Sequence, residues 1–312
     1  MDRIESFDIL KGIGIILMIV AHTYGPNNII WNFIYAFHMP LFFIVSGYFY
    51  KQKTFSLLIK KNSNQLLAPY ITLCLIVTAL TQLRQPHEIQ NDINSTLYGM
   101  GPAWFLLAMF MVRLEFHYIL HFFPKKYLLV SLFISTTTCF IANYQGLSSF
   151  LSFYPSLASL FFVAIGYYIR MHSLLDQTKE QSNIFLFVGL LFWLTTSLYG
   201  KVDMSQCTFK LSLVDFCGSI GGTFLLFKLS LLIDKYNSRI REILINAGKY
   251  SLVILFFHSI DYCIPVWYVI EPYLPSTFLL FIILIIRLLF ITICVSITLR
   301  EKWAREFFRI KL

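Results

Sequence analysis

The chain has 312 residues, of which 57% are hydrophobic and only 13% are charged. Soluble domains carry about 25% charged residues, so this composition excludes a water-soluble globule, and its apolar content excludes a disordered chain. The net charge of +9 is typical of the basic cytoplasmic loops of membrane proteins, and we predict no nucleic-acid partner. The six cysteines form no CxxC or Cys/His cluster, so neither a disulfide framework nor a metal site is predicted.

Apolar runs separated by turn residues predict ten transmembrane helices, because a helical span needs about 20 apolar residues. We place them at 7–24, 31–50, 66–83, 102–121, 127–144, 152–170, 183–200, 211–232, 250–269 and 278–299. The short loops between them predict antiparallel neighbours in an all-α polytopic bundle. We expect a single membrane domain over residues 1–312, with no C-terminal soluble domain.

The basic residues predict how this bundle is oriented. If the N-terminus is cytoplasmic, 20 of the 25 Lys and Arg residues fall on the inner side, and only Arg84, Lys201 and Lys210 fall in outer loops. The remaining two, Arg113 and Arg287, lie inside spans. This asymmetry follows the positive-inside rule, so we predict that both termini are cytoplasmic.

The first span carries three polar residues that lipid does not favour. Charged groups inside a span are costly and by default mark a functional site. Lys11 and His22 are eleven residues apart, which is three helical turns, so they lie on one face about 16 Å apart. Asp8 shares that face. The alternative, in which Asp8 caps the helix, Lys11 snorkels and His22 is interfacial, stays open.

Later spans carry further ionisable residues. His258 and Asp261 are three residues apart on one helix and are close enough to interact, so the carboxylate is expected to orient the imidazole. The alternative is a structural contact between helices. Arg113 and Arg287 are each expected to pair with an acid on another span, such as Glu115.

The second predicted span has an unusual sequence from His38 to Tyr48. Pro40 predicts a kink in the helix. The following Ser46-Gly47 pair predicts a place where a neighbouring backbone approaches closely.

Four segments together point to one family: residues 3–12 with His22, 38–48, 102–106, and 248–252 with His258. In this order they resemble the acyltransferase-3 family of membrane acyltransferases, and 38–48 looks most like its fucose 4-O-acetylase-like branch. The resemblance implies O-acylation of a carbohydrate in the bacterial plasma membrane, with acetyl-CoA as a substrate and no bound cofactor. Lys11 stands where the family has Arg, and the family's Arg-x-x-Arg pair is missing from 60–65.

The resemblance also implies roles for single residues. His22 is expected to act as the general base or as a transient acyl carrier, with Asp8 and Lys11 on its helix face. His258 and Asp261 are expected to form a second acid–base pair. Contact with the acyl donor is expected from Lys11 and from Arg3, Lys60, Lys61, His38 and Ser46.

The expected partners are acetyl-CoA, a carbohydrate or glycolipid acceptor, and membrane lipids. The sequence leaves open whether the acyl group is acetyl or succinyl, and which sugar accepts it. Two other classes also stay open. A flippase or transporter of a lipid-linked saccharide fits a bundle with intramembrane charges, although no internal repeat is evident. A structural membrane subunit would tolerate the loss of His22 and Lys11.

Overall fold

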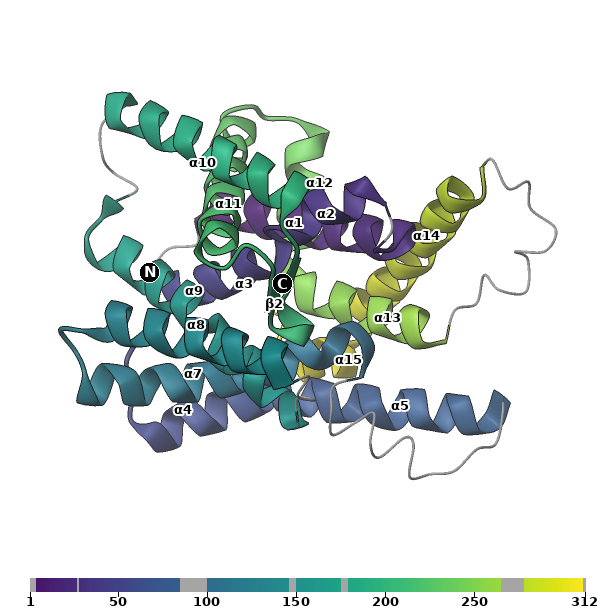
Figure 1. Cartoon of the computed structure of the whole chain (residues 1–312). Coiled ribbons are helices and arrows are strands. Elements are labelled where there is room, and N and C mark those ends of the chain that lie inside the picture. Colours follow the sequence, from purple (N-terminus) through teal and green to yellow (C-terminus); the bar gives the residue numbers. More distant parts are fainter. Residues whose placement is uncertain are drawn as a thin grey trace.

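The structure is a computed structural model that describes residues 4–26, 28–84, 100–145, 150–174, 179–264 and 278–310. These residues are almost wholly helical, which confirms the predicted all-α class (Figure 1). Within the described ranges the sole β structure is an antiparallel pair of two-residue strands, β1 (Val202–Asp203) and β2 (Thr208–Phe209).

Each of the ten predicted spans overlaps one or two helices. The first part of the chain forms α1 (Glu5–Tyr24), α2 (Ile29–Tyr35), α3 (His38–Tyr48), α4 (Phe55–Asn62), the π-helical turn η1 (Ser63–Leu67), α5 (Ala68–Arg84), η2 (Gly101–Ala103), α7 (Trp104–Phe122) and α8 (Tyr127–Gln145). The rest forms η3 (Phe150–Ser152), α9 (Phe153–Met171), α10 (Lys179–Tyr199), η5 (Met204–Gln206), α11 (Leu213–Asp234), α12 (Arg239–Lys249), α13 (Ser251–Cys263), α14 (Leu279–Arg300) and α15 (Lys302–Phe308).

Six helical segments among the described residues are long and apolar enough to cross a membrane, and a seventh is added if the bent pair α12–α13 forms one span. They comprise α1, α2 with α3, α4 with α5, α7, α11 and α14. Shorter apolar stretches lie in α8 and α10. The protein is therefore a helical polytopic membrane protein by length and composition, while the number ten and the side of each terminus stay predictions.

Helix α1 carries three of the predicted site residues, Asp8, Lys11 and His22. It packs against α2, α3, α11, α12, α13 and α14 (Figure 1). Glycines permit its contact with α12, because a Cβ at Gly12 would overlap the carbonyl of Leu244, and a Cβ at Gly248 would overlap the carbonyl of Asp8. Small residues at a helix crossing let two backbones touch. This contact holds the Lys11 end of α1 in place.

The second predicted span is broken rather than simply kinked. α2 ends at Tyr35 and α3 begins at His38, so Pro40 lies in the first turn of a new helix, where its missing N–H is not needed. The expected close approach at Gly47 is confirmed, because a Cβ there would overlap the carbonyl of Val163 in α9. The break places His38 at the start of α3.

Candidate active site

The end of α1 that carries His22, here called the outer end after the predicted orientation, meets His258 of α13. Nδ1 of His22 lies 2.8 Å from Nε2 of His258, and the rings stack with centroids 5.0 Å apart. His258 is fully buried, whereas His22 is half-buried. His22 is therefore the member of the pair that a substrate can reach.

The hydrogen bond between the imidazoles restricts where their protons lie. One of the two nitrogens must donate, and Nδ1 of His258 has no hydrogen-bond partner among the described residues. When His22 donates from Nδ1, its Nε2 carries a lone pair. That lone pair can take a proton or attack a carbonyl, so the pair provides either a general base or an acyl carrier.

Three further rings surround His22. The centroids of Tyr262, Tyr35 and His38 lie 5.3, 5.9 and 6.4 Å from its own. Tyr262 is exposed and Tyr35 is half-buried, whereas His38 is 1% exposed and its Nδ1 lies 3.2 Å from the carbonyl oxygen of Ile34. His38 thus belongs to the outer end. The contact with the acyl donor that we expected for it stays a prediction.

Among the described residues, no hydrogen bond or ion pair joins Asp261 to His258 as the sequence predicted. Its Oδ2 lies 3.0 Å from Nε of Arg287 in α14, and both side chains are less than 5% exposed. Arg287 also donates from Nη1 to Oγ1 of Thr23 at 3.2 Å. A buried guanidinium is always charged, so leaving it without a carboxylate costs more free energy than leaving a neutral imidazole without one. Asp261 therefore pairs with Arg287 and not with His258. That Arg287 pairs with an acid on another helix is confirmed, although the acid is not Glu115.

The opposite, inner end of α1 carries the second charged cluster. Nζ of Lys11 lies 2.8 Å from Oδ1 of Asp8, so the predicted shared face is confirmed. Arg3 lies outside the described residues. Lys60 and Lys61 are exposed on α4, and their contact with the donor stays a prediction.

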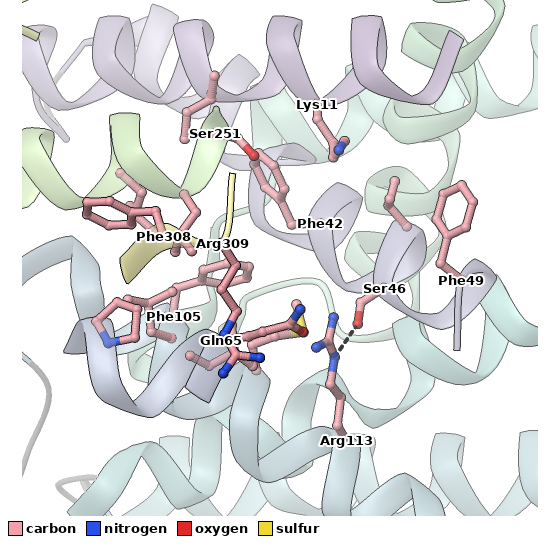
Figure 2. A pocket seen from close by; sticks show the side chains of 18 of the residues that line it. Lys11, Phe42, Ser46, Phe49, Gln65, Phe105, Arg113, Ser251, Phe308 and Arg309 are labelled. Atoms are coloured by element: carbon pink, nitrogen blue, oxygen red, sulfur yellow. Dashed lines mark hydrogen bonds between the residues drawn. The ribbon is translucent and has the colours of Figure 1, made fainter. Parts of the chain in front are cut away.

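A cavity of about 400 Å³ opens beside this inner end (Figure 2). Apolar side chains make most of its wall, among them Met18, Met39, Phe42, Phe105 and Leu255. Its polar lining includes Lys11, Ser46, Gln65, Arg113, Ser251 and Arg309. A largely apolar cavity with a few convergent polar groups is the usual form of a small-molecule site.

Arg113 forms no ion pair with an acidic side chain among the described residues, contrary to the prediction of an acid on another span. Its Nε donates to Oγ of Ser46 at 3.0 Å and its Nη1 donates to Oδ1 of Asn62 at 3.2 Å. Glu115 instead accepts a 2.6 Å hydrogen bond from Ser156. Residues two apart on a helix point in different directions, so Arg113 and Glu115 meet different neighbours. Figure 2 shows the Arg113 side chain reaching Ser46 at the cavity wall.

The cavity follows α1 toward the histidine pair. Lys11, Ile15 and Met18 line it, and with His22 they share one helical face. His22 lies one turn beyond Met18, about 6 Å along the helix axis. The cavity therefore lies on the same face of α1 as His22.

Sequence reasoning missed two parts of this cavity. Arg309 was predicted only as one of the 20 basic residues on the inner side, and nothing in the sequence singled out Gln65. Arg113 had a signal, since it is a lone arginine inside an apolar span, but the expected partner was an acid on another span, and the partners in the structure are Ser46 and Asn62. Among the described residues, no group of three or more His, Cys, Asp or Glu side chains is placed to hold a metal.

Comparison with known proteins identifies the family of this chain. Residues 4–301 match the family described as "Acyltransferase domain". The chain belongs to the acyltransferase-3 family. A similar curated protein is nodulation protein NolL of Mesorhizobium japonicum, 32% identical over 127 residues. That match covers 35% of this chain and 34% of the relative, so the similarity spans about a third of the curated protein. No solved structure gives a significant match.

Proposed function

We propose that this membrane acyltransferase is an O-acetyltransferase. It transfers acetyl from cytoplasmic acetyl-CoA to a sugar hydroxyl of a cell-surface polysaccharide or its lipid-linked precursor, in the bacterial plasma membrane. The observation that carries the proposal is the continuous face of α1. A cavity with basic groups lies at its Lys11 end, and the hydrogen-bonded pair of His22 with His258 lies at the other.

The two ends of this face suit the two substrates. With the predicted cytoplasmic N-terminus, the cavity opens where acetyl-CoA is present, and its apolar wall suits the pantetheine arm. The half-buried His22 lies at the end where a surface glycan or lipid-linked sugar arrives. Tyr35 and Tyr262 beside it offer both ring faces and hydroxyl groups, which suit a sugar.

In this proposal His22 is the general base. Its Nε2 takes the proton from the acceptor hydroxyl, while the hydroxyl oxygen attacks the thioester carbonyl. The carbon–sulfur bond breaks, and the CoA thiolate leaves and receives the proton. His258 accepts the hydrogen bond from Nδ1 of His22 and so stabilises the imidazolium that forms. The products are an acetyl ester and CoA.

The test is acyl transfer from radiolabelled acetyl-CoA in proteoliposomes, with bacterial glycans and lipid-linked saccharides as acceptors. We expect label in glycan with wild type and a loss of at least about 100-fold with His22→Ala. His121→Ala is the matched control, because His121 is an exposed histidine at the end of α7. Succinyl-CoA in parallel reports the acyl group. Stopping the reaction with acid and measuring the radioactivity bound to the protein reports whether an acyl–enzyme intermediate forms.

Each other outcome changes the proposal in a defined way. If folded protein transfers neither acetyl nor succinyl to any acceptor but moves a lipid-linked saccharide across the bilayer, the protein is a flippase. If transfer survives His22→Ala, the acyltransferase activity stands and His22 is not the base. If label accumulates on wild-type protein and not on His22→Ala, His22 is an acyl carrier.

A further inference from the structure

Arg113 presents a positive charge to the cavity without a carboxylate to neutralise it. Its hydrogen-bond partners, Ser46 and Asn62, are both neutral, and it forms no salt bridge with any acidic side chain in the described part of the chain. A charge inside a membrane span is costly when it is not compensated. The uncompensated guanidinium therefore indicates a negatively charged ligand.

The surroundings of Arg113 strengthen this indication. Lys61 lies within electrostatic reach of Arg113, Lys51 and Lys53. Arg309 lines the same cavity, as does Lys11, and Lys11 forms an ion pair with Asp8. Clustered positive charge at the mouth of a low-dielectric cavity concentrates anions there. The ligand that fits best carries several negative charges and an apolar extension.

We propose that Arg113 anchors the diphosphate of the acyl-CoA donor, an assignment that rests on the proposed function. Ser46 and Asn62 accept hydrogen bonds from Nε and Nη1, which fixes the plane of the guanidinium. A guanidinium has five N–H groups, so both N–H groups of Nη2 and one of Nη1 remain for the ligand. Such a fixed fork suits two phosphate oxygens.

The position of Arg113 along the cavity favours the diphosphate of the donor, and not its 3′-phosphate, as the group that Arg113 binds. In CoA the diphosphate joins the pantetheine arm directly, and the 3′-phosphate lies beyond it on the ribose. Arg113 is half-buried within the cavity, whereas Arg309 and Lys61 are exposed. A donor whose thioester points toward His22 therefore has its diphosphate at Arg113 and its 3′-phosphate near the exposed cations.

The test is equilibrium binding of CoA and of dephospho-CoA, which lacks only the 3′-phosphate, to purified protein in nanodiscs. For Arg113→Gln we expect the Kd of both ligands to rise by about 10- to 100-fold, because charge-assisted hydrogen bonds are lost. Lys125→Gln is the matched control, since it removes an exposed positive charge from the loop after α7. Arg113→Lys keeps a charge without the fork, and an intermediate rise is expected.

Three results would overturn the assignment. An unchanged Kd for CoA would remove Arg113 from the donor site. A rise for CoA but not for dephospho-CoA would move Arg113 to the 3′-phosphate. An equal rise in Lys125→Gln would show a general effect of charge. If Arg113→Gln does not fold, the same comparisons use Arg113→Lys. Failure of wild type to bind either ligand would instead contradict the proposed function.

Discussion

Charged side chains near the two ends of α1 differ in whether an ion pair neutralises them. At the outer end the ion pair of Asp261 with Arg287 is closed, with both side chains less than 5% exposed, and the group that a substrate can reach is the imidazole of His22. At the inner end Arg113 faces a cavity with neutral partners. Lys11 lines the same cavity and is paired, but 26% of its side chain is exposed.

The comparison distinguishes charged groups that neutralise each other within the fold from charged groups that can bind a ligand. A buried ion pair whose charges cancel stabilises one arrangement of helices and attracts nothing further. A cation that faces a cavity with neutral partners attracts an anion. The outer pair therefore holds α13 and α14 together near His22, and we propose that the inner cations bind the donor.

Removing one partner of the outer ion pair should destabilise the protein strongly. Arg287→Leu leaves the carboxylate of Asp261 buried and unpaired, so we expect the free energy of unfolding to fall by about 3–5 kcal/mol. Thermal unfolding in detergent measures this loss. The double variant Asp261→Leu with Arg287→Leu should recover most of it, because no buried charge remains. An equal loss in the single and double variants would mean that packing, not charge, is responsible.

Loss of the second histidine should slow the reaction without weakening donor binding. In His258→Ala, Nδ1 of His22 has lost its acceptor, and we expect kcat to fall by about 100-fold with an unchanged KM for acetyl-CoA. His258→Gln keeps a hydrogen-bond acceptor and should retain more activity. Steady-state kinetics in proteoliposomes measures both constants. A rise in KM alone would place His258 in the donor site instead.

Changing Lys11 should affect the donor more than the chemistry. We expect Lys11→Gln to raise the KM for acetyl-CoA by about 10-fold and to change kcat by less than about twofold, because one charge–charge contact is lost. Lys11→Arg retains the charge and restores the residue usual in the family. Donor titrations at saturating acceptor give both values. A fall in kcat at constant KM would contradict this prediction and assign Lys11 to the transition state.

Local features of the molecule were predictable because they depend on residues near one another in the chain. Apolar runs of about 20 residues and their turn residues marked helical segments, because each predicted span overlaps at least one helix, although residues 265–269 lie outside the described residues. The interval between Lys11 and His22 put them on one face, because helix geometry is regular. The pair of Asp8 with Lys11 follows from the same spacing and is present at 2.8 Å.

Partners on different helices could not be predicted in the same way. Asp261 is three residues from His258 but contacts Arg287, and Arg113 is two residues from Glu115 but contacts Ser46 and Asn62. The spacing of two residues in the sequence predicts whether they are close to each other on the same helix. It carries no information about which helices pack together, and in these two cases the packing decided the contact.

The amino-acid sequence is sufficient to predict a helical membrane protein of the acyltransferase-3 family, with polar groups along one face of its first helix. Which charged groups are buried in ion pairs and which face a cavity is known only from the packing of the helices, because the burial and neutralisation of a residue depend on every helix around it. The structure thus joined His22 to His258 across 236 positions of sequence and left Arg113 facing the cavity beside Lys11.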